Sequence, residues 1–223
     1  MPPLKFSKSE EYLKIDPNAE AEILDAYAET LDDANVEDIY LKHLPIIFQK
    51  LHIPHCFTRD IDNCVQWFYD TQFYGTTGDS NKARASKSLL QQLTLSRTHK
   101  GELEVSDVVD IDKLIIFGNR LVKFRDHFPE IKKAWRLFIE ASGEGKKSND
   151  SELLDAVLTL KDLQRVKGVL GLDDVSDSIL IDMLGCGTTT LDGQVLNYDA
   201  NASGLAVGIK DFAEILGQIG QLE

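Results

Sequence analysis

The sequence is poor in cysteine and has no long apolar run. Its 223 residues include three cysteines, Cys56, Cys64 and Cys186, without the Cys-x-x-Cys spacing of redox and zinc motifs. A small, odd number of cysteines predicts no disulfide framework and a reducing compartment. No stretch approaches the roughly 18 apolar residues that a membrane span needs, and the polar start MPPLKFSKSEEYLK predicts no signal peptide. We therefore expect a nuclear and cytoplasmic protein that makes no membrane contact.

Basic residues are also scarce. There are 24 Lys and Arg against 37 Asp and Glu, a net charge of −13. Residues 1–70 carry −8 and residues 148–223 carry −9, whereas the middle of the chain is mildly basic. Acidic ends repel phosphate backbones, so we expect no direct specific DNA binding and instead an attraction for basic partners. The basic stretch at 123–147 could contact DNA or an acidic partner, and this alternative stays open. A face exposed only to solvent is the simpler interpretation.

What the sequence has in abundance is helical periodicity. Apolar residues recur at i, i+3, i+4 and i+7, the spacing of one helix face, in most of the chain. Residues 75–106 break this pattern, and their Gly, Ser, Thr and Lys content predicts a long exposed insertion with a short helix at 87–95. The periodic segments predict helices at 20–31, 41–51, 60–69, 111–124, 129–141, 160–170, 177–184 and 209–222.

The predicted helices can be grouped as four helix–loop–helix units. A helix with apolar spacing, a loop, and a second helix that opens with an apolar residue is the layout of an EF-hand. The segment EIKKAWRLF (130–138) looks like the entering helix of calmodulin's third hand. We expect an all-α, calmodulin/centrin-like fold of four degenerate EF-hand units in two lobes. An ordinary helical bundle is the alternative, because amphipathic helices alone are not specific.

The expected lobes have definite limits in the sequence. We place an N-terminal tail at 1–18, an N-terminal lobe at 19–124 with the insertion at 75–106, and a C-terminal lobe at 125–223. The eighth loop residue of each unit is apolar, and we expect these residues to pair as short antiparallel strands, Ile39 with Val109 and Leu158 with Val207.

Three of the four loops lack the residues that calcium needs. The ion takes oxygen ligands at loop positions 1, 3, 5, 7, 9 and 12, the last a bidentate Glu, with Gly at position 6. The first loop, 32–43, has alanine and valine among its ligand positions and ends in His43. The second loop ends in Lys113, and the third is stretched up to Asp162. We expect no metal in these three.

The fourth loop is less clear. Asp199, Asn201, Ser203 and Gly204 reproduce the front half of a calcium loop. Twelve residues counted from Asp199 end at Lys210, and Asp211 lies one residue further on. We favour a turn without an ion, and a calcium sensor that acts through this loop alone is the alternative function.

Other motifs are weaker. His52, His55 and Cys56 supply three possible zinc ligands, but no fourth ligand has a recognisable spacing, so a turn with surface histidines is favoured. Gly-Cys-Gly at 185–187 lacks the strand and the Gly-Lys-Ser/Thr of a phosphate-binding loop. Cys186 has no convincing His/Asn pairing. We therefore expect no catalytic residue, no enzyme activity and no cofactor.

With these segments laid out, the chain resembles the fungal Rad thirty-three family. The segments that carry the resemblance are EILDAYAET (22–30), KHLPIIFQKL (42–51), LTLKDLQRV (158–166), ILIDMLGCGT (179–188) and DFAEILGQIG (211–220). The resemblance implies a centrin-like accessory protein of nucleotide excision repair with degenerate calcium loops. It also implies binding to the damage-recognition factor Rad four, the counterpart of the xeroderma pigmentosum group C protein, in response to DNA damage.

An opened EF-hand lobe presents a hydrophobic cup in which an amphipathic helix can lay its apolar face. The acidic C-terminal segment would attract Lys and Arg beside such a helix. About a third of our candidate residues should face the partner, the others being core. The candidates are Trp135, Phe138, Leu163, Val166, Leu170, Met183, Leu184, Phe212, Ile215 and Leu216.

Overall fold

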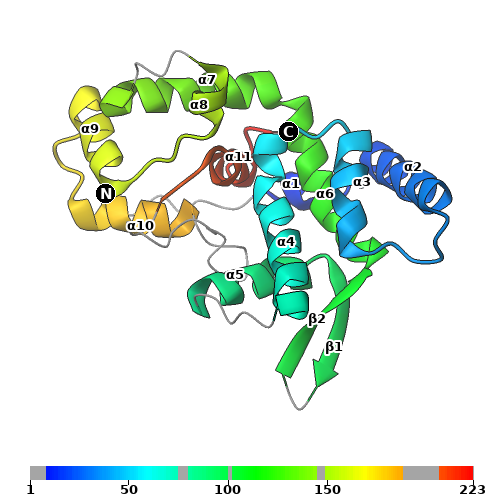
Figure 1. Ribbon diagram of the computed structural model, residues 1–223. Helices are drawn as coiled ribbons and strands as arrows, with labels where there is room; N and C mark the ends of the chain where they lie inside the picture. The colour runs from blue at the N-terminus through cyan, green and yellow to red at the C-terminus, as the bar shows by residue number, and fades with distance from the viewer. Residues whose placement is uncertain (1–8, 75–79, 100–101, 145–148, 188–205, 223) are drawn as a thin grey trace. The chain divides into compact units, whose positions relative to one another are not determined.

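A computed structural model describes residues 9–74, 80–99, 102–144, 149–187 and 206–222. The described chain is mostly helical (Figure 1). It forms two compact units: unit 1 comprises Met1–Lys14 and His127–Glu223, and unit 2 comprises Ile15–Asp126. Among the described helices, none has both the length and the apolar character to cross a lipid bilayer.

Unit 2 contains helices and one β-hairpin. Strands β1 and β2 pair in antiparallel fashion, with His99 opposite Glu102 next to the tip. The expectation of an all-α chain is therefore right for most of the described residues but misses this hairpin. The elements are α2 (Pro17–Ala34), α3 (Leu44–Lys50), α4 (Arg59–Tyr74), α5 (Ser80–Gln91), β1 (Thr94–His99), β2 (Glu102–Val109) and α6 (Ile111–Asp126), with short 3-10 turns at Leu41–His43 and His55–Phe57.

Helix α2 has clear local start and stop signals. The Asp16 side chain accepts a hydrogen bond from the Asn18 N–H at 2.8 Å, which caps the helix, and Pro17 opens its first turn, where no N–H is needed. The helix ends at Asn35, which adopts a left-handed conformation with φ 49°. The observed helix extends beyond the predicted 20–31 at both ends.

The buried face of α2 differs from the predicted one. The i, i+3, i+4 and i+7 spacing in 20–31 predicts an inner face that includes Leu24 and Ala28. Both are exposed, whereas Ile23 and Ala26 are buried. Helix α2 packs against α6 so closely that a Cβ on Gly118 would lie 2.9 Å from the Ile23 Cδ1 atom. The close approach to this glycine selects the face that carries Ile23.

The segment predicted as an exposed insertion is partly a core element, so that prediction is wrong. Helix α5 begins earlier than the short helix expected at 87–95, and it packs on α4 and β2. Leu89, Leu90 and Leu93 are buried at its end. The polar composition of 75–106 concealed these three leucines, which are sufficient to anchor the helix.

Unit 1 contains α1 (Glu10–Leu13), α7 (Phe128–Ile139), α8 (Asp150–Leu154), α9 (Leu160–Leu170), α10 (Asp177–Gly187) and α11 (Ile209–Gln218), with a helical turn at Glu140–Glu144. Its core is centred on Trp135, which is fully buried. The Trp135 ring packs 5.4 Å from the Phe212 ring between centroids, and its Nε1–H donates to the Leu153 carbonyl at 2.8 Å. Helix α8, which the sequence did not predict, supplies that carbonyl.

Residues 9–14, expected in an N-terminal tail, form part of unit 1. Tyr12 is fully buried, and its hydroxyl donates to the Glu214 Oε2 atom of α11 at 2.9 Å. The Ser9 N–H donates to the Gln218 carbonyl at 2.9 Å. Gly217 leaves room for the Tyr12 ring, because a Cβ at this position would lie 2.2 Å from the Tyr12 Cε2 atom.

Candidate functional site

The helix–loop–helix units are bridged in pairs as the sequence predicts. The Val109 N–H donates to the Ile39 carbonyl at 2.8 Å in unit 2. In unit 1, Leu158 and Val207 exchange two backbone hydrogen bonds of 2.8 and 2.9 Å. Isolated antiparallel bridges, Tyr40 with Val108 and Leu158 with Val207, mark the same places. These hydrogen bonds confirm the predicted pairing of the four eighth-position residues and fix the register of each loop.

Position 12 of each loop lies four residues after the residue that forms the bridge. In three of the four loops, the side chain at this position acts as a helix cap. The His43 Nδ1 atom accepts from the Tyr40 N–H at 3.1 Å. The Asp162 Oδ2 atom accepts from the Thr159 N–H at 2.9 Å, and the Asp211 Oδ2 atom accepts from the Gly208 N–H at 2.9 Å. In each case the acceptor satisfies a backbone donor at the start of the following helix. These side chains thus make the same local contact in three loops.

The environment of His43 favours its neutral form. Burial lowers the pKa of the His43 imidazole, the charge of Lys42 lowers it further, and Asp107 opposes the shift. A neutral ring is needed for Nδ1 to accept the Tyr40 N–H, because both ring nitrogens of a protonated imidazole are donors. The first loop therefore ends in an uncharged nitrogen acceptor.

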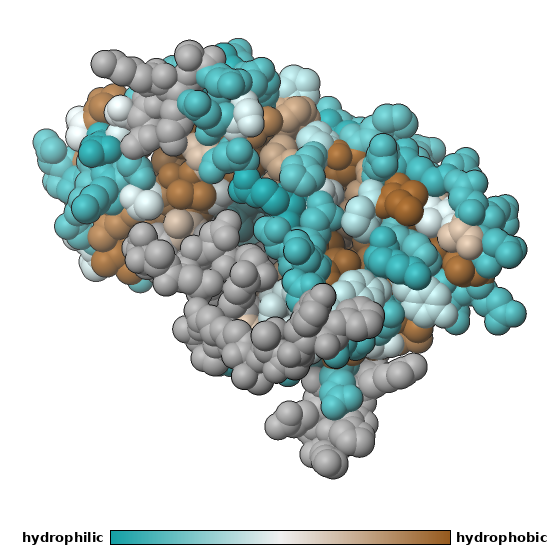
Figure 2. Space-filling model, in the orientation of Figure 1, coloured by the Kyte–Doolittle hydropathy of each residue, from teal (hydrophilic) through white to brown (hydrophobic). Residues whose placement is uncertain are grey.

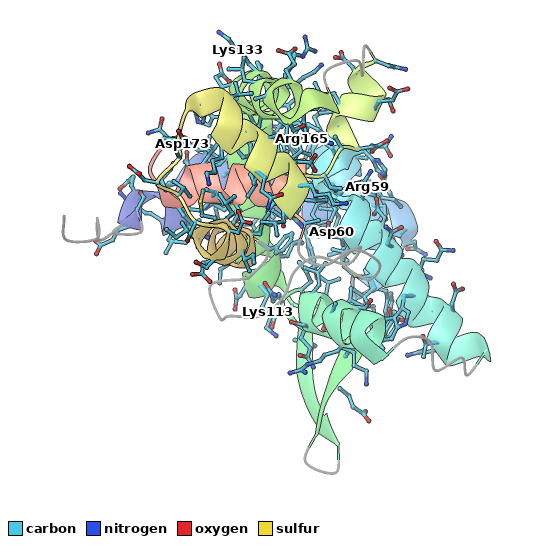
Figure 3. The ribbon with its side chains drawn as sticks, turned by 90° about the vertical axis from the view of Figure 1, so that its left-hand side faces the viewer. Arg59, Asp60, Lys113, Lys133, Arg165 and Asp173 are labelled. Carbon is cyan, nitrogen blue, oxygen red and sulfur yellow. The ribbon has the colours of Figure 1, made fainter. Side chains whose placement is uncertain are left out.

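Position 12 of the second loop carries a cation. The Lys113 Nζ atom donates to the Gln91 carbonyl at 2.9 Å and to the Thr94 carbonyl at 2.7 Å. These carbonyls belong to the end of α5 and the start of β1, so the ammonium group links the insertion to α6 (Figure 3). A lysine ammonium has donors and no acceptor, and it repels a divalent cation at this place.

The fourth loop is only partly within the described residues. Asp199, Asn201, Ser203 and Gly204, the front half of the possible calcium loop, lie outside them. The bridge at Val207 identifies Asp211, and not Lys210, as the residue equivalent to position 12. In the part of the chain that the structure describes, no group of three or more His, Cys, Asp or Glu side chains could hold a metal ion.

The ten candidate cup residues separate into core and surface. Trp135, Val166, Leu184 and Phe212 are buried in unit 1 and serve as its core. Leu163, Ile215 and Leu216 are half-buried. Phe138, Leu170 and Met183 are exposed at 37%, 60% and 55%. Of the ten, these last three are the most accessible to a partner.

Exposed apolar side chains that the sequence analysis did not single out lie near two of these three. Val169 and Leu172 are close to Leu170 in the chain, and Ile179 is one turn before Met183. The signal that could have identified Ile179 is the apolar character of α10 on more than one side, because a helix with a single buried face needs apolar residues on that face only.

The weaker motifs form no site in the described structure. The His55 Nε2 atom lies 3.5 Å from the Asp62 Oδ2 atom, and the His55 side chain is exposed. In the basic stretch at 123–147, Lys132 and Arg136 both pair with Asp150, at 2.7 and 2.9 Å. A hydrogen bond from Lys132 lowers the pKa of the Asp150 carboxyl. Two of the basic groups of this stretch are thus engaged within unit 1.

The geometry defines a mostly helical protein with two units, each built of helix–loop–helix segments whose loops are joined by a backbone bridge. The family model of Rad33 matches residues 9–175. Because this match covers more than half of the chain, the chain belongs to the Rad33 family, which confirms the resemblance inferred from the sequence.

A curated relative agrees with this membership. The chain is similar to the DNA repair protein RAD33 of Saccharomyces cerevisiae (strain ATCC 204508 / S288c), with 29% identity over 121 residues. The match covers 54% of this chain and 60% of that relative. No solved structure shows a significant match to the chain.

Proposed function

We propose that this protein is a non-catalytic adaptor in DNA repair that binds an amphipathic helix of a damage-recognition protein without calcium. Membership of the Rad33 family and the name of the yeast relative support the repair role and a nuclear location. The partner that the family resemblance implies is the Rad four factor of nucleotide excision repair. The adaptor would stabilise this factor by clasping one of its helices.

The fold supports the proposal through its paired loops. We interpret each unit as a pair of EF-hand-like segments, because the loop bridges join the residues that an EF-hand pair would join. In such pairs the helices can open and expose an apolar surface. With His43, Asp162 and Asp211 used as helix caps and Lys113 bound to carbonyls, the twelfth loop positions are engaged within the protein.

The observation that carries the proposal is the exposure of Phe138, Leu170 and Met183 in unit 1. Burial of a large apolar side chain contributes about 2–3 kcal/mol. Three such anchors contribute up to about 9 kcal/mol before the cost of association, and a Kd of about 1 μM requires a net of about 8 kcal/mol. These side chains would therefore supply a large share of the binding free energy, with the rest of the interface supplying the remainder.

A peptide titration tests the proposal. A labelled helical peptide from the damage-recognition factor is added to the full chain, once with a chelator and once with millimolar calcium. We expect the same low-micromolar or tighter Kd in both buffers, because no calcium is required to form the surface. Binding that appears only with calcium would favour the calcium sensor, and an absence of binding in both buffers would contradict the adaptor.

A further inference from the structure

Five exposed apolar side chains lie at the end of α9, in the turn after it and on α10. Figure 1 shows this turn between the two helices. These five side chains are between 47% and 68% exposed, and we call them the α9–α10 surface: Val169, Leu170, Leu172, Ile179 and Met183. Figure 2 shows hydrophobic side chains gathered over this corner of the molecule. Scattered single apolar residues on a surface are ordinary, whereas several exposed apolar residues on two helices that pack together indicate an interaction site.

The core of unit 1 does not use this side of α10. Leu180 and Leu184 are buried at 4% and 2% exposure and fix the inner face of the helix. Ile179 and Met183, four residues apart, form a second apolar stripe that stays exposed. Among the residues that the structure describes, this apolar face of α10 is not part of the core of unit 1.

The turn between the helices holds the surface in a defined shape. Gly171 adopts a left-handed conformation with φ 64°, and the Leu172 N–H donates to the Lys167 carbonyl at 3.1 Å. This is the hydrogen bond of a helix C-terminal cap, which fixes the chain on both sides of the glycine. The Gln164 side chain also donates to Asp177 at 2.9 Å and so ties α9 to the start of α10. The apolar side chains are thus presented on an ordered corner.

The charges around this surface select the partner. Between residues 166 and 187 the chain carries one lysine and four exposed aspartates, Asp173, Asp174, Asp177 and Asp182. Figure 3 shows Asp173 in the turn between α9 and α10. A second copy of this chain would bring the same carboxylates to a symmetric contact, and their repulsion disfavours it. A helix whose apolar face is flanked by Lys or Arg is complementary both to the apolar side chains and to the aspartates around them.

We infer that the α9–α10 surface is the docking site for an amphipathic partner helix with basic residues beside its apolar face. The inference rests on the proposed function and assigns that function to one surface. Ile179 and Met183 would contact one side of the partner helix, and Leu170 and Leu172 would contact the other. The aspartates would accept hydrogen bonds and ion pairs from the basic side chains at the rim.

Two apolar-to-charged variants test the site. With the peptide from the damage-recognition factor as the probe, we expect Leu170→Asp and Met183→Asp to raise the Kd at least about tenfold, because each removes an anchor and buries a charge. Ile181→Asp is the matched control, because Ile181 lies on the opposite side of α10 and is similarly exposed. It should leave the Kd within about twofold, and circular dichroism should show all three variants folded.

A charge test addresses the rim. The double variant Asp173→Lys with Asp174→Lys should raise the Kd of the peptide by about 3- to 10-fold at low salt, and by less at high salt. If the wild-type chain binds the peptide and the Leu170, Met183 and aspartate variants bind it equally well, the inference is wrong while the adaptor function stands. If the wild-type chain does not bind, both fail. If the wild-type chain instead dimerises and Leu170→Asp restores the monomer, a second copy occupies the surface and the inference is overturned.

Discussion

At the scale of single residues, two of the four loops end in a side chain that is not a carboxylate. A calcium loop ends in a carboxylate that gives both oxygens to the ion. Here the His43 Nδ1 atom accepts a hydrogen bond from a backbone N–H. The positively charged ammonium group of Lys113 donates to two backbone carbonyl groups. Both side chains thus make hydrogen bonds within unit 2.

The buried imidazole of His43 makes stability depend on pH. Its pKa in the folded protein is below the ordinary value of 6.5, so the unfolded chain takes up a proton first as the pH falls. The stabilisation is complete above pH 6.5 and is lost between there and the lowered pKa. We expect the free energy of unfolding of the wild-type chain to fall over this window, as measured by urea titration at several pH values.

Two variants separate this effect from other titrations. His43→Asn keeps a side-chain acceptor and removes the titrating ring, so its stability should vary less with pH. His52→Asn is the control: His52 is exposed with φ 55°, a conformation that asparagine adopts readily, and the pH dependence should stay that of the wild-type chain. An unchanged slope in His43→Asn would show that another group is responsible.

At the scale of secondary-structure elements, the sequence predicted what depends on neighbouring residues. Helix α9 has its predicted bounds, because Gly171 ends it through a left-handed cap and Asp162 caps its start. Helix α3 contains Pro45 in its first turn, where the missing N–H of proline is not needed. The loop bridges also agree, because their position depends only on a fixed count from the flanking apolar residues.

What the sequence could not predict depends on distant residues. The inner face of α2 is determined by its fit against Gly118, so Ile23 is buried and Leu24 remains outside. In the candidate cup, spacing identified the apolar residues of unit 1 but could not separate the core residue Trp135 from the exposed Met183. That distinction depends on which helices cover each side chain.

The contact between α1 and α11 is specific enough to test with one methyl group. Gly217→Ala would place a Cβ on the Tyr12 ring, at 2.2 Å from Cε2, so the ring must leave its site. We expect unit 1 to lose about 2–4 kcal/mol of stability, close to the loss in Tyr12→Ala, as measured by chemical unfolding. The double variant, Gly217→Ala with Tyr12→Ala, should lose little more stability than either single variant, because both substitutions remove the same contact.

A second glycine provides the control for this experiment. Gly168→Ala is also a helix substitution in unit 1, and a Cβ at this position meets no atom within 4 Å. It should stabilise α9 by about 0.5–1 kcal/mol through its helix propensity. Equal effects of the two alanines would mean that the Tyr12 ring does not occupy the space beside Gly217.

At the scale of the whole molecule, the two units can be followed separately by their tryptophans. Trp67 belongs to unit 2 and Trp135 to unit 1, and the chain has two tryptophans in all. A Trp67→Phe variant therefore reports the fluorescence of unit 1, and a Trp135→Phe variant reports that of unit 2.

Removal of residues 1–14 should lower the unfolding midpoint reported by one tryptophan much more than that reported by the other. The truncation takes away Tyr12 and its contacts with α11, so we expect the midpoint of Trp135 unfolding to fall by several degrees. The midpoint reported by Trp67 should change much less, although the deletion is next to unit 2 in the sequence. A larger shift of Trp67 than of Trp135 would contradict the assignment of α1 to unit 1.

The position of Tyr12 also has a consequence for biosynthesis. Its partner Glu214 is 202 residues further along the chain, and the whole of unit 2 is translated between them. A nascent chain can complete unit 2 while it is still attached to the ribosome, because domains fold as units during synthesis. Helix α1 has to wait until α11 has left the exit tunnel, so the Tyr12 ring stays uncovered while the residues between it and Glu214 are translated.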